Sequence, residues 1–173
     1  MHSPHILGFA ARSGTGKTTL LARLIPILKH RGLKIGVIKH SHHDFEIDHP
    51  GKDSHTLRAA GASPVMIVSP HRRALITEFH PPRELDLQAQ LADFPQDDLD
   101  LILVEGFRHE RFAKIELHRP SLGKPPLYPE DDSIIAIASD RQLDSTDCLP
   151  RLDLNDPDAI ADFIFQHFFE PNP

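Results

Sequence analysis

Short apolar runs alternate with longer segments of helical periodicity along most of the chain. The runs predict buried strands at residues 5–11, 35–39, 99–104 and 134–138. Apolar residues at helical spacing predict helices that start at Lys17, after Asp53 or Ser54, near Leu85 and near Asp156. Strands that alternate with helices are typical of a doubly wound α/β fold with a mostly parallel sheet.

Several shorter patterns add detail to this fold. Residues 64–68 and 74–79 predict an antiparallel hairpin. Residues 114–118 alternate between apolar and polar, which predicts a strand with one wet face. We expect strands 74–79 and 113–118 to be exposed, so that their edges can pair across a two-fold axis.

Polar and breaking residues suggest how the helices begin and end. Pro26 is expected to kink or shorten the first helix, and Gly32 to end it. Asp53 or Ser54 is expected to cap the second helix.

Composition then narrows the class of protein. The 173 residues fit one domain, 1–173, and 39% hydrophobic with 25% charged residues indicates a globular chain. A net charge of −6 favours no nucleic-acid partner, and the absence of a long apolar run predicts no membrane span. Cys148 is the single cysteine, which excludes an internal disulfide, and the N-terminus resembles no signal peptide. We therefore expect a cytoplasmic protein; its 13 histidines remain to be explained.

A glycine-rich segment supplies the strongest chemical signal. Ala-Arg-Ser-Gly-Thr-Gly-Lys-Thr at residues 11–18 matches a phosphate-binding P-loop, with alanine in place of its first glycine. A strand precedes it and a helix follows, so backbone N–H groups and the helix dipole would face the phosphates. Lys17 would reach the β- and γ-phosphates, and the Thr18 hydroxyl would bind Mg²⁺. The predicted nucleotide-binding residues are Ser13, Gly14, Thr15, Gly16, Lys17, Thr18 and Thr19.

Nucleotide hydrolysis also needs an acid at the end of a neighbouring strand. Glu105 follows the apolar run 101–104 and precedes Gly106, so it is the candidate for a catalytic acid near Mg²⁺. The alternative is a surface acid at a strand end. Asp100 lies at the other end of that run, where a turn or capping residue is expected.

A histidine-rich loop, Lys-His-Ser-His-His-Asp at residues 39–44, follows the second strand. Parallel strands open onto one ligand-binding edge, which brings this loop near the phosphates. Three interpretations stay open: His42, His43 and Asp44 hold zinc or nickel; Asp44 is a further catalytic acid near Mg²⁺, with the histidines contacting nucleotide or a partner; or the loop is merely solvated. In the next polar cluster, residues 50–54, Lys52 would add a cation.

Six motifs in this order resemble the MobB family of molybdopterin-guanine dinucleotide biosynthesis adapter proteins: residues 14–19, 39–44, 50–54, 57–62, 100–107 and 138–140. The resemblance implies a P-loop GTP-binding homodimer with weak GTPase activity and the cofactors GTP and Mg²⁺. It implies as partners a MobA-type guanylyltransferase and the molybdenum-inserting enzyme. It also implies a second nucleotide-contacting segment, made of Pro50, Gly51, Lys52 and Asp53.

Guanine preference requires an acceptor for the N1–H and N2–H₂ donors, which adenine lacks. Asp140, after the last buried strand, can be that acceptor or simply a turn residue. Two other functions on the same fold are a small-molecule kinase and, because of the histidines, a metallochaperone GTPase.

Overall fold

The computed structural model describes residues 3–41, 45–143 and 149–170. Contacts between Cα atoms divide the chain into two compact units. Unit 1 comprises residues 1–40 and 87–173, and unit 2 comprises residues 41–86. The expectation of a single domain, 1–173, stays a prediction.

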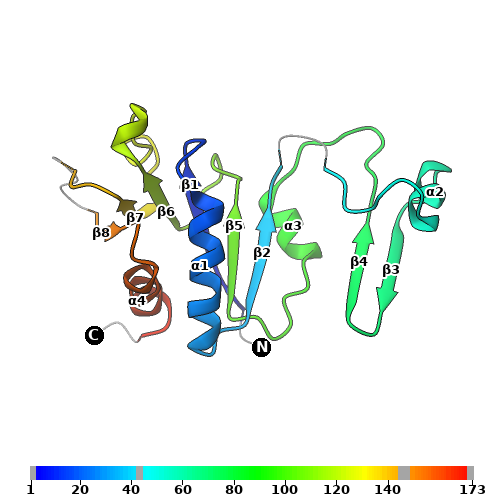
Figure 1. Ribbon diagram of the computed structural model, residues 1–173, viewed down its shortest axis with the longest axis horizontal. Coiled ribbons are helices and arrows are strands. Elements are labelled where there is room, and N and C mark those ends of the chain that lie inside the picture. Colours follow the sequence, from blue (N-terminus) through cyan, green and yellow to red (C-terminus); the bar gives the residue numbers. More distant parts are fainter. Residues whose placement is uncertain (1–2, 42–44, 144–148, 171–173) are drawn as a thin grey trace. The chain divides into compact units, whose positions relative to one another are not determined.

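Unit 1 is a six-stranded parallel sheet in the order β2-β5-β1-β6-β7-β8 (Figure 1). Its strands are β1 (His5–Ala11), β2 (Ile35–Lys39), β5 (Leu101–Glu105), β6 (Lys114–His118), β7 (Ile134–Ser139) and β8 (Arg151–Asp153). Its helices are α1 (Lys17–His30), α3 (Leu87–Asp93), α4 (Pro157–Phe168) and the 3₁₀ turn η1 (Pro120–Leu122). The prediction of a mostly parallel α/β sheet is confirmed.

The main core lies between the sheet and the helices α1 and α4. Leu7 and Phe9 of β1 pack there with Leu24 of α1 and Ile164 of α4, all at most 2% exposed. Each such buried side chain contributes about 1.5–3 kcal/mol relative to an exposed one. The apolar stripes of the two helices therefore fix both against one face of the sheet.

Local signals decide where the helices begin and end. Asp156 caps α4, because its side chain accepts hydrogen bonds from the N–H groups of Asp158 and Ala159. Gly32 follows α1 with a φ of 96°, as expected of a helix stop. Pro26 does not shorten α1, since the helix continues past it to His30, and a kink at Pro26 stays a prediction.

The prediction of a wet face on β6 is wrong. All five residues of β6 are buried, and the strand lies between β1 and β7 rather than at an edge. Its polar residues Lys114, Glu116 and His118 are at most 7% exposed. Residues 113–118 therefore offer no free edge for pairing between subunits.

Unit 2 contains α2 (Asp53–Ala59) and the antiparallel hairpin of β3 (Val65–Ser69) and β4 (Arg72–Ile76). The hairpin confirms the prediction, although β4 begins two residues earlier than expected. Lys52 is the N-cap of α2 and no side chain caps it, so the predicted cap is wrong; Ser54 instead donates to Asp48, 3.0 Å away.

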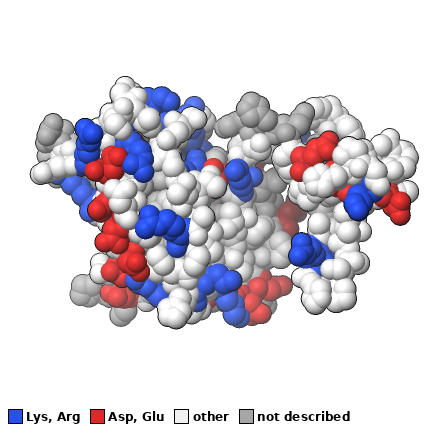
Figure 2. Space-filling model, viewed as in Figure 1, with Lys and Arg blue, Asp and Glu red and all other residues white. Residues whose placement is uncertain are grey.

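Several apolar side chains of unit 2 are exposed: Phe45, Ile47, Leu57, Met66, Ile67, Val68 and Leu75. On the face drawn in Figure 2, the hairpin surface carries few charged side chains. No described helix of either unit combines the length and the apolar character that crossing a membrane requires.

Candidate functional site

The predicted phosphate loop forms a tight turn between β1 and α1 (Figure 1). Gly14 and Gly16 have φ values of 88° and 95°, a region that L side chains rarely adopt. The buried Thr15 closes the turn, because its hydroxyl donates to the backbone oxygen of Arg12 at 2.6 Å. The sequence needs both glycines here for their backbone conformation.

The first turn of α1 is left open at its N-terminus. Its N-cap is Gly16, which has no side chain to cap the helix, and the first turn holds no acidic residue. α4 differs, because Asp156 caps it and Asp158 lies in its first turn. Uncapped N–H groups and the positive end of the helix dipole fit an anion in front of α1.

Glu105 lies at the end of β5 between two lysines. Its carboxylate oxygens are 3.6 Å from Nζ of Lys17 and 3.7 Å from Nζ of Lys39, and its side chain is 16% exposed. Lys39 comes close because it is the register partner of Glu105 across β2 and β5. The structure thus brings Lys17 and Glu105 together, and it adds Lys39, which begins the 39–44 motif but had no role assigned from the sequence.

A close turn follows Glu105 and contacts His40, the residue after β2. The N–H of His40 donates to the backbone oxygen of Glu105 at 2.8 Å, and the ring of His40 lies 4.7 Å from that of Phe107. Gly106 has a φ of 104°, and a Cβ there would lie 2.6 Å from Cβ of His40. Only glycine fits this position without a shift of the backbone.

Arg119, directly after β6, is a second residue that sequence reasoning missed. Its Nε donates to the backbone oxygen of Thr15 at 2.8 Å, and its Nη1 bonds Oδ2 of Asp140 at 2.6 Å. Lys124, on the same connection, donates to the backbone oxygen of Ser13 at 3.3 Å. The structure therefore places Asp140 one side chain away from the phosphate loop.

Buried Glu116 fixes the connection that carries Lys124. Its carboxylate accepts hydrogen bonds from the N–H groups of Leu127 and Tyr128 at 2.7 and 2.8 Å. Burial raises the pKa of Glu116, although those two N–H groups and the neighbouring Arg12 and His118 oppose the rise. These two hydrogen bonds hold the connection after β6 against that strand.

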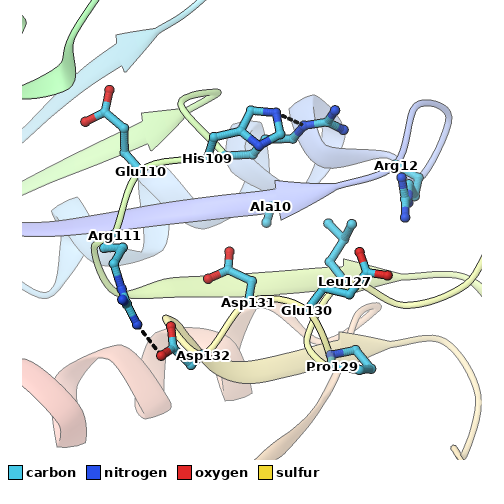
Figure 3. Close-up of a pocket in the computed structure, with 11 residues that line it drawn as sticks. Ala10, Arg12, His109, Glu110, Arg111, Leu127, Pro129, Glu130, Asp131 and Asp132 are labelled. Atoms are coloured by element: carbon cyan, nitrogen blue, oxygen red, sulfur yellow. Dashed lines mark hydrogen bonds and ion pairs between the residues drawn. The ribbon is translucent and has the colours of Figure 1, made fainter.

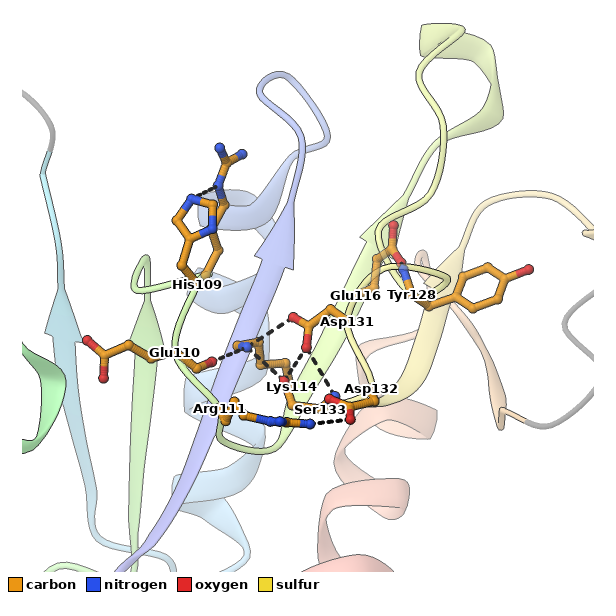
Figure 4. A network of polar contacts seen from close by, with 10 residues as sticks. His109, Glu110, Arg111, Lys114, Glu116, Tyr128, Asp131, Asp132 and Ser133 are labelled. Atoms are coloured by element: carbon orange, nitrogen blue, oxygen red, sulfur yellow. Dashed lines mark hydrogen bonds and ion pairs between the residues drawn. The ribbon is translucent and has the colours of Figure 1, made fainter.

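Buried Lys114 holds the same connection farther along (Figure 4). Its Nζ donates to Asp131 at 3.0 Å and to Ser133 at 2.8 Å, and also to the backbone oxygen of Glu110. Burial alone would raise the pKa of Asp131, but the hydrogen bonds from Ser133 and Lys114 outweigh it and lower that pKa. Through its bonds to Glu110 and Asp131, Lys114 connects the loop after β5 to the loop after β6.

A cavity of about 620 Å³ lies between these two loops, over Ala10 of β1 (Figure 3). Arg12 of the phosphate loop lines one end of the cavity and Arg111 lines the opposite end (Figure 3), and Arg108 is a further lining residue. Arg111 forms an ion pair with Asp132, and Arg108 donates to His109 at 3.0 Å. Both arginines therefore bond partners that lie outside the phosphate loop.

The remaining predicted residues lie at the phosphate loop and in unit 2. Ser13, Thr18 and Thr19 are exposed at the phosphate loop, as a ligand would require. Pro50 to Asp53 precede and begin α2 in unit 2, and their contact with nucleotide stays a prediction.

Part of the histidine loop falls beyond the structural description. His42, His43 and Asp44 lie outside the described residues, so their interpretations stay open. Within the described ranges no cluster of three or more His, Cys, Asp or Glu side chains could hold a metal ion.

Comparisons with known proteins agree on one family. The family model described as Molybdopterin guanine dinucleotide synthesis protein B matches residues 6–140. The Molybdopterin-guanine dinucleotide biosynthesis adapter protein of Escherichia coli is 49% identical over 168 residues, covering 96% of this chain and 95% of that protein. The adapter protein of Haemophilus influenzae is 44% identical, covering 92% and 86%.

Solved structures agree with the sequence comparisons. The crystal structure of molybdopterin-guanine biosynthesis protein B superposes with a TM-score of 0.72 at 28% identity, covering 95% of this chain and 99% of that one. The crystal structure of Bacillus subtilis MobB has the same TM-score at 23% identity and supports the fold alone. The predicted P-loop fold with its hairpin is confirmed.

Proposed function

Because the chain belongs to the MobB family and is a molybdopterin-guanine dinucleotide biosynthesis adapter, we propose that it performs this role as a GTP-binding protein. GTP with Mg²⁺ is the proposed ligand, and the phosphate loop at the start of α1 is the proposed site. The protein is proposed to act in the cytoplasm. The observation that carries the proposal is the uncapped N-terminus of α1, with Lys17 and Glu105 beside it.

The proposed roles follow from the charges at this site. Lys17 exchanges its contact with Glu105 for the β- and γ-phosphates, because a triphosphate carries more charge than one carboxylate. The exposed Thr18 hydroxyl and the carboxylate of Glu105 are oxygen ligands of the kind that Mg²⁺ prefers. Mg²⁺, when bound, neutralises part of the phosphate charge.

Asp140 is the proposed guanine-reading residue. A carboxylate accepts both N1–H and N2–H₂ of guanine, whereas adenine offers no such pair of donors. The contact between Asp140 and Arg119, which holds the phosphate loop, supports this role. Pro50, Gly51, Lys52 and Asp53 are proposed to contact the nucleotide as well.

Guanine reading is tested by exchanging the acceptor for a donor. In Asp140→Asn, the amide donates where the carboxylate accepted, so it fits xanthine, which has an oxygen at C2. We expect the Kd for GTP to rise and the Kd for XTP to fall, each by about tenfold or more. Calorimetric titration of both proteins measures this, and unchanged preferences would reject Asp140 as the reading residue.

Hydrolysis is proposed to be slow, with Glu105 and Asp44 as the acids near Mg²⁺. Arg108 and Arg111, which follow Glu105, bond His109 and Asp132, which lie outside the phosphate loop. A slow GTPase suits an adapter whose nucleotide state controls association. The variant Glu105→Gln separates GTP hydrolysis from the adapter role: if stimulation of the partner persists while hydrolysis stops, turnover is not part of the function.

Homodimer formation is proposed to use the hairpin of unit 2. Met66, Val68 and Leu75 are 54%, 72% and 57% exposed, and β4 retains an edge within the described part of the hairpin. Apolar side chains of this exposure mark protein–protein surfaces. Val68→Asp is expected to give a folded monomer, with the mass measured by light scattering and folding checked by circular dichroism, and a persistent dimer would exclude this surface.

The proposed partners are a MobA-type guanylyltransferase and the molybdenum-inserting enzyme. The adapter role of the family implies contact with enzymes of the same biosynthesis. A pull-down of the guanylyltransferase with the protein in its GTP, GDP and empty states tests whether nucleotide controls association. Equal recovery in the three states would contradict a nucleotide-controlled adapter.

A further inference from the structure

One guanidinium joins the phosphate loop to the residue after β7. The Nε of Arg119 donates to the backbone oxygen of Thr15, and its Nη1 bonds Oδ2 of Asp140. The position of a Cβ on Gly16 would lie 3.8 Å from Nη2 of the same side chain. Arg119 therefore contacts both parts of the proposed nucleotide site at once.

The sheet itself sets this arrangement. His118 and Ser139 are register partners at the ends of the parallel strands β6 and β7. Arg119 and Asp140 each come one residue later, so the strand pairing delivers the two side chains to each other. The turn η1, with Pro120 at its first position, then leads the chain away from Arg119.

The contact with Arg119 uses one carboxylate oxygen of Asp140 and leaves the other without a hydrogen-bond partner in the described part of the chain. Oδ1 of Asp140 is buried and has no hydrogen-bond partner among the described residues, while Oδ2 is held by Arg119. A buried acceptor without a donor is unfavourable, so a ligand that supplies a donor there is favoured. Oδ2 has a second lone pair and can accept from a ligand as well.

Asp140 also borders a space large enough for a base. A cavity of about 420 Å³ is lined by residues at the ends of β7 and β8, among them Ser139, Asp140 and Leu152. Its volume lies within the range of small-molecule sites. A planar heterocycle with two adjacent N–H donors would meet the carboxylate of Asp140 from this side.

We propose that Arg119 is a positioning residue for base specificity: it fixes the carboxylate of Asp140 and couples the base that is bound to the conformation of the phosphate loop. This inference rests on the proposed function, since it assumes that the loop binds nucleotide. The N1–H and N2–H₂ donors of guanine bond the carboxylate of Asp140, which the Arg119 guanidinium holds in place. Because Arg119 also bonds the backbone oxygen of Thr15, the position of Asp140 affects the conformation of the phosphate loop. Adenine supplies no donor pair, so it gains nothing from Arg119 beyond the shape of the loop.

The test compares two cations that hold the same loop. Arg119 and Lys124 both donate to backbone oxygens of the phosphate loop, but only Arg119 bonds Asp140. Arg119→Gln is therefore expected to raise the Kd for GTP about 10- to 100-fold and the Kd for ATP much less. Lys124→Gln is expected to raise both values by the same factor, so that the ratio of the two is unchanged.

A conservative variant and a double variant sharpen the result. Arg119→Lys keeps the charge but lacks the two spaced donors, Nε and Nη1, that hold Thr15 and Asp140 in a fixed geometry, so ATP affinity is expected to recover while base discrimination does not. In Asp140→Ala, the further loss of Arg119 is expected to leave the GTP-to-ATP ratio unchanged. Circular dichroism and melting temperatures confirm that each variant is folded.

The outcomes separate this inference from the proposed function. If the unmodified protein binds neither GTP nor ATP, the proposed function fails. If it prefers GTP and Arg119→Gln keeps that preference, or loses it no more than Lys124→Gln does, the role of Arg119 is overturned while nucleotide binding stands.

Discussion

The turn after β5 gives the sharpest stability prediction, through the substitution Gly106→Ala. Gly106 has a φ of 104°, and its Cβ would lie 2.6 Å from Cβ of His40 and 3.3 Å from the backbone oxygen of His40. The left-handed conformation costs an L residue about 1–2 kcal/mol. The backbone shift needed to relieve the contact costs about 1–3 kcal/mol more.

The two costs sum to a loss of about 2–5 kcal/mol in the free energy of unfolding. For a chain of this length that corresponds to a melting temperature lowered by about 4–20 °C. The N–H of His40 also bonds the backbone oxygen of Glu105, so displacing His40 disturbs the carboxylate beside Lys17. We therefore expect weaker binding of Mg²⁺-GTP in the same variant.

Gly32→Ala is the matched control. Gly32 has a φ of 96°, but a Cβ there would meet nothing within 4 Å. It therefore incurs only the conformational cost of about 1–2 kcal/mol. Thermal and urea unfolding of both variants, with GTP titration, measures the difference. Equal losses of stability, with equal GTP affinity, would refute the contact between Gly106 and His40.

Two further substitutions test charges in unit 1. Glu105→Gln is expected to reduce the ratio of the Kd for GTP in EDTA to that in Mg²⁺ by about tenfold; an unchanged ratio would contradict a role near Mg²⁺. Asp131→Asn removes the charged partner of buried Lys114 and is expected to lower stability at pH 7 by about 1–3 kcal/mol in urea titrations. Because the folded pKa of Asp131 lies below 3.8, its contribution is present above that value and disappears as the pH falls through the folded pKa. The variant should therefore lose less stability on acidification, and parallel acid profiles would contradict this.

Strands that are continuous apolar runs could be predicted from the sequence. β1, β2, β5 and β7 are such runs, and each has the predicted type within a few residues of the predicted ends. The alternating pattern of β6 predicted a wet face wrongly, because the polar side chains of this strand are buried. Lys114 pairs with Asp131, 17 residues away, and the carboxylate of Glu116 accepts from N–H groups of a later loop. β8 has three residues, two of them exposed, and so carries no apolar run.

In the candidate site, too, residues of a local motif could be predicted from the sequence, and residues brought together by the sheet could not. Gly14, Gly16 and Lys17 form a local motif, and its geometry was predictable from sequence. Lys39 and Arg119 were missed because their contacts arise from strand register, β2 with β5 and β6 with β7, which no short motif encodes. The order of strands in the sheet would have been needed to find them.

The central claim is that the phosphate loop before α1 binds nucleotide, and one titration tests it most directly. GTP with Mg²⁺ is titrated into the unmodified protein and into Lys17→Ala. In that variant Glu105 still has Lys39 beside it, so the melting temperature should be nearly unchanged. The account predicts GTP binding by the unmodified protein and a Kd raised at least about tenfold in Lys17→Ala. Equal affinity in the two folded proteins would contradict it.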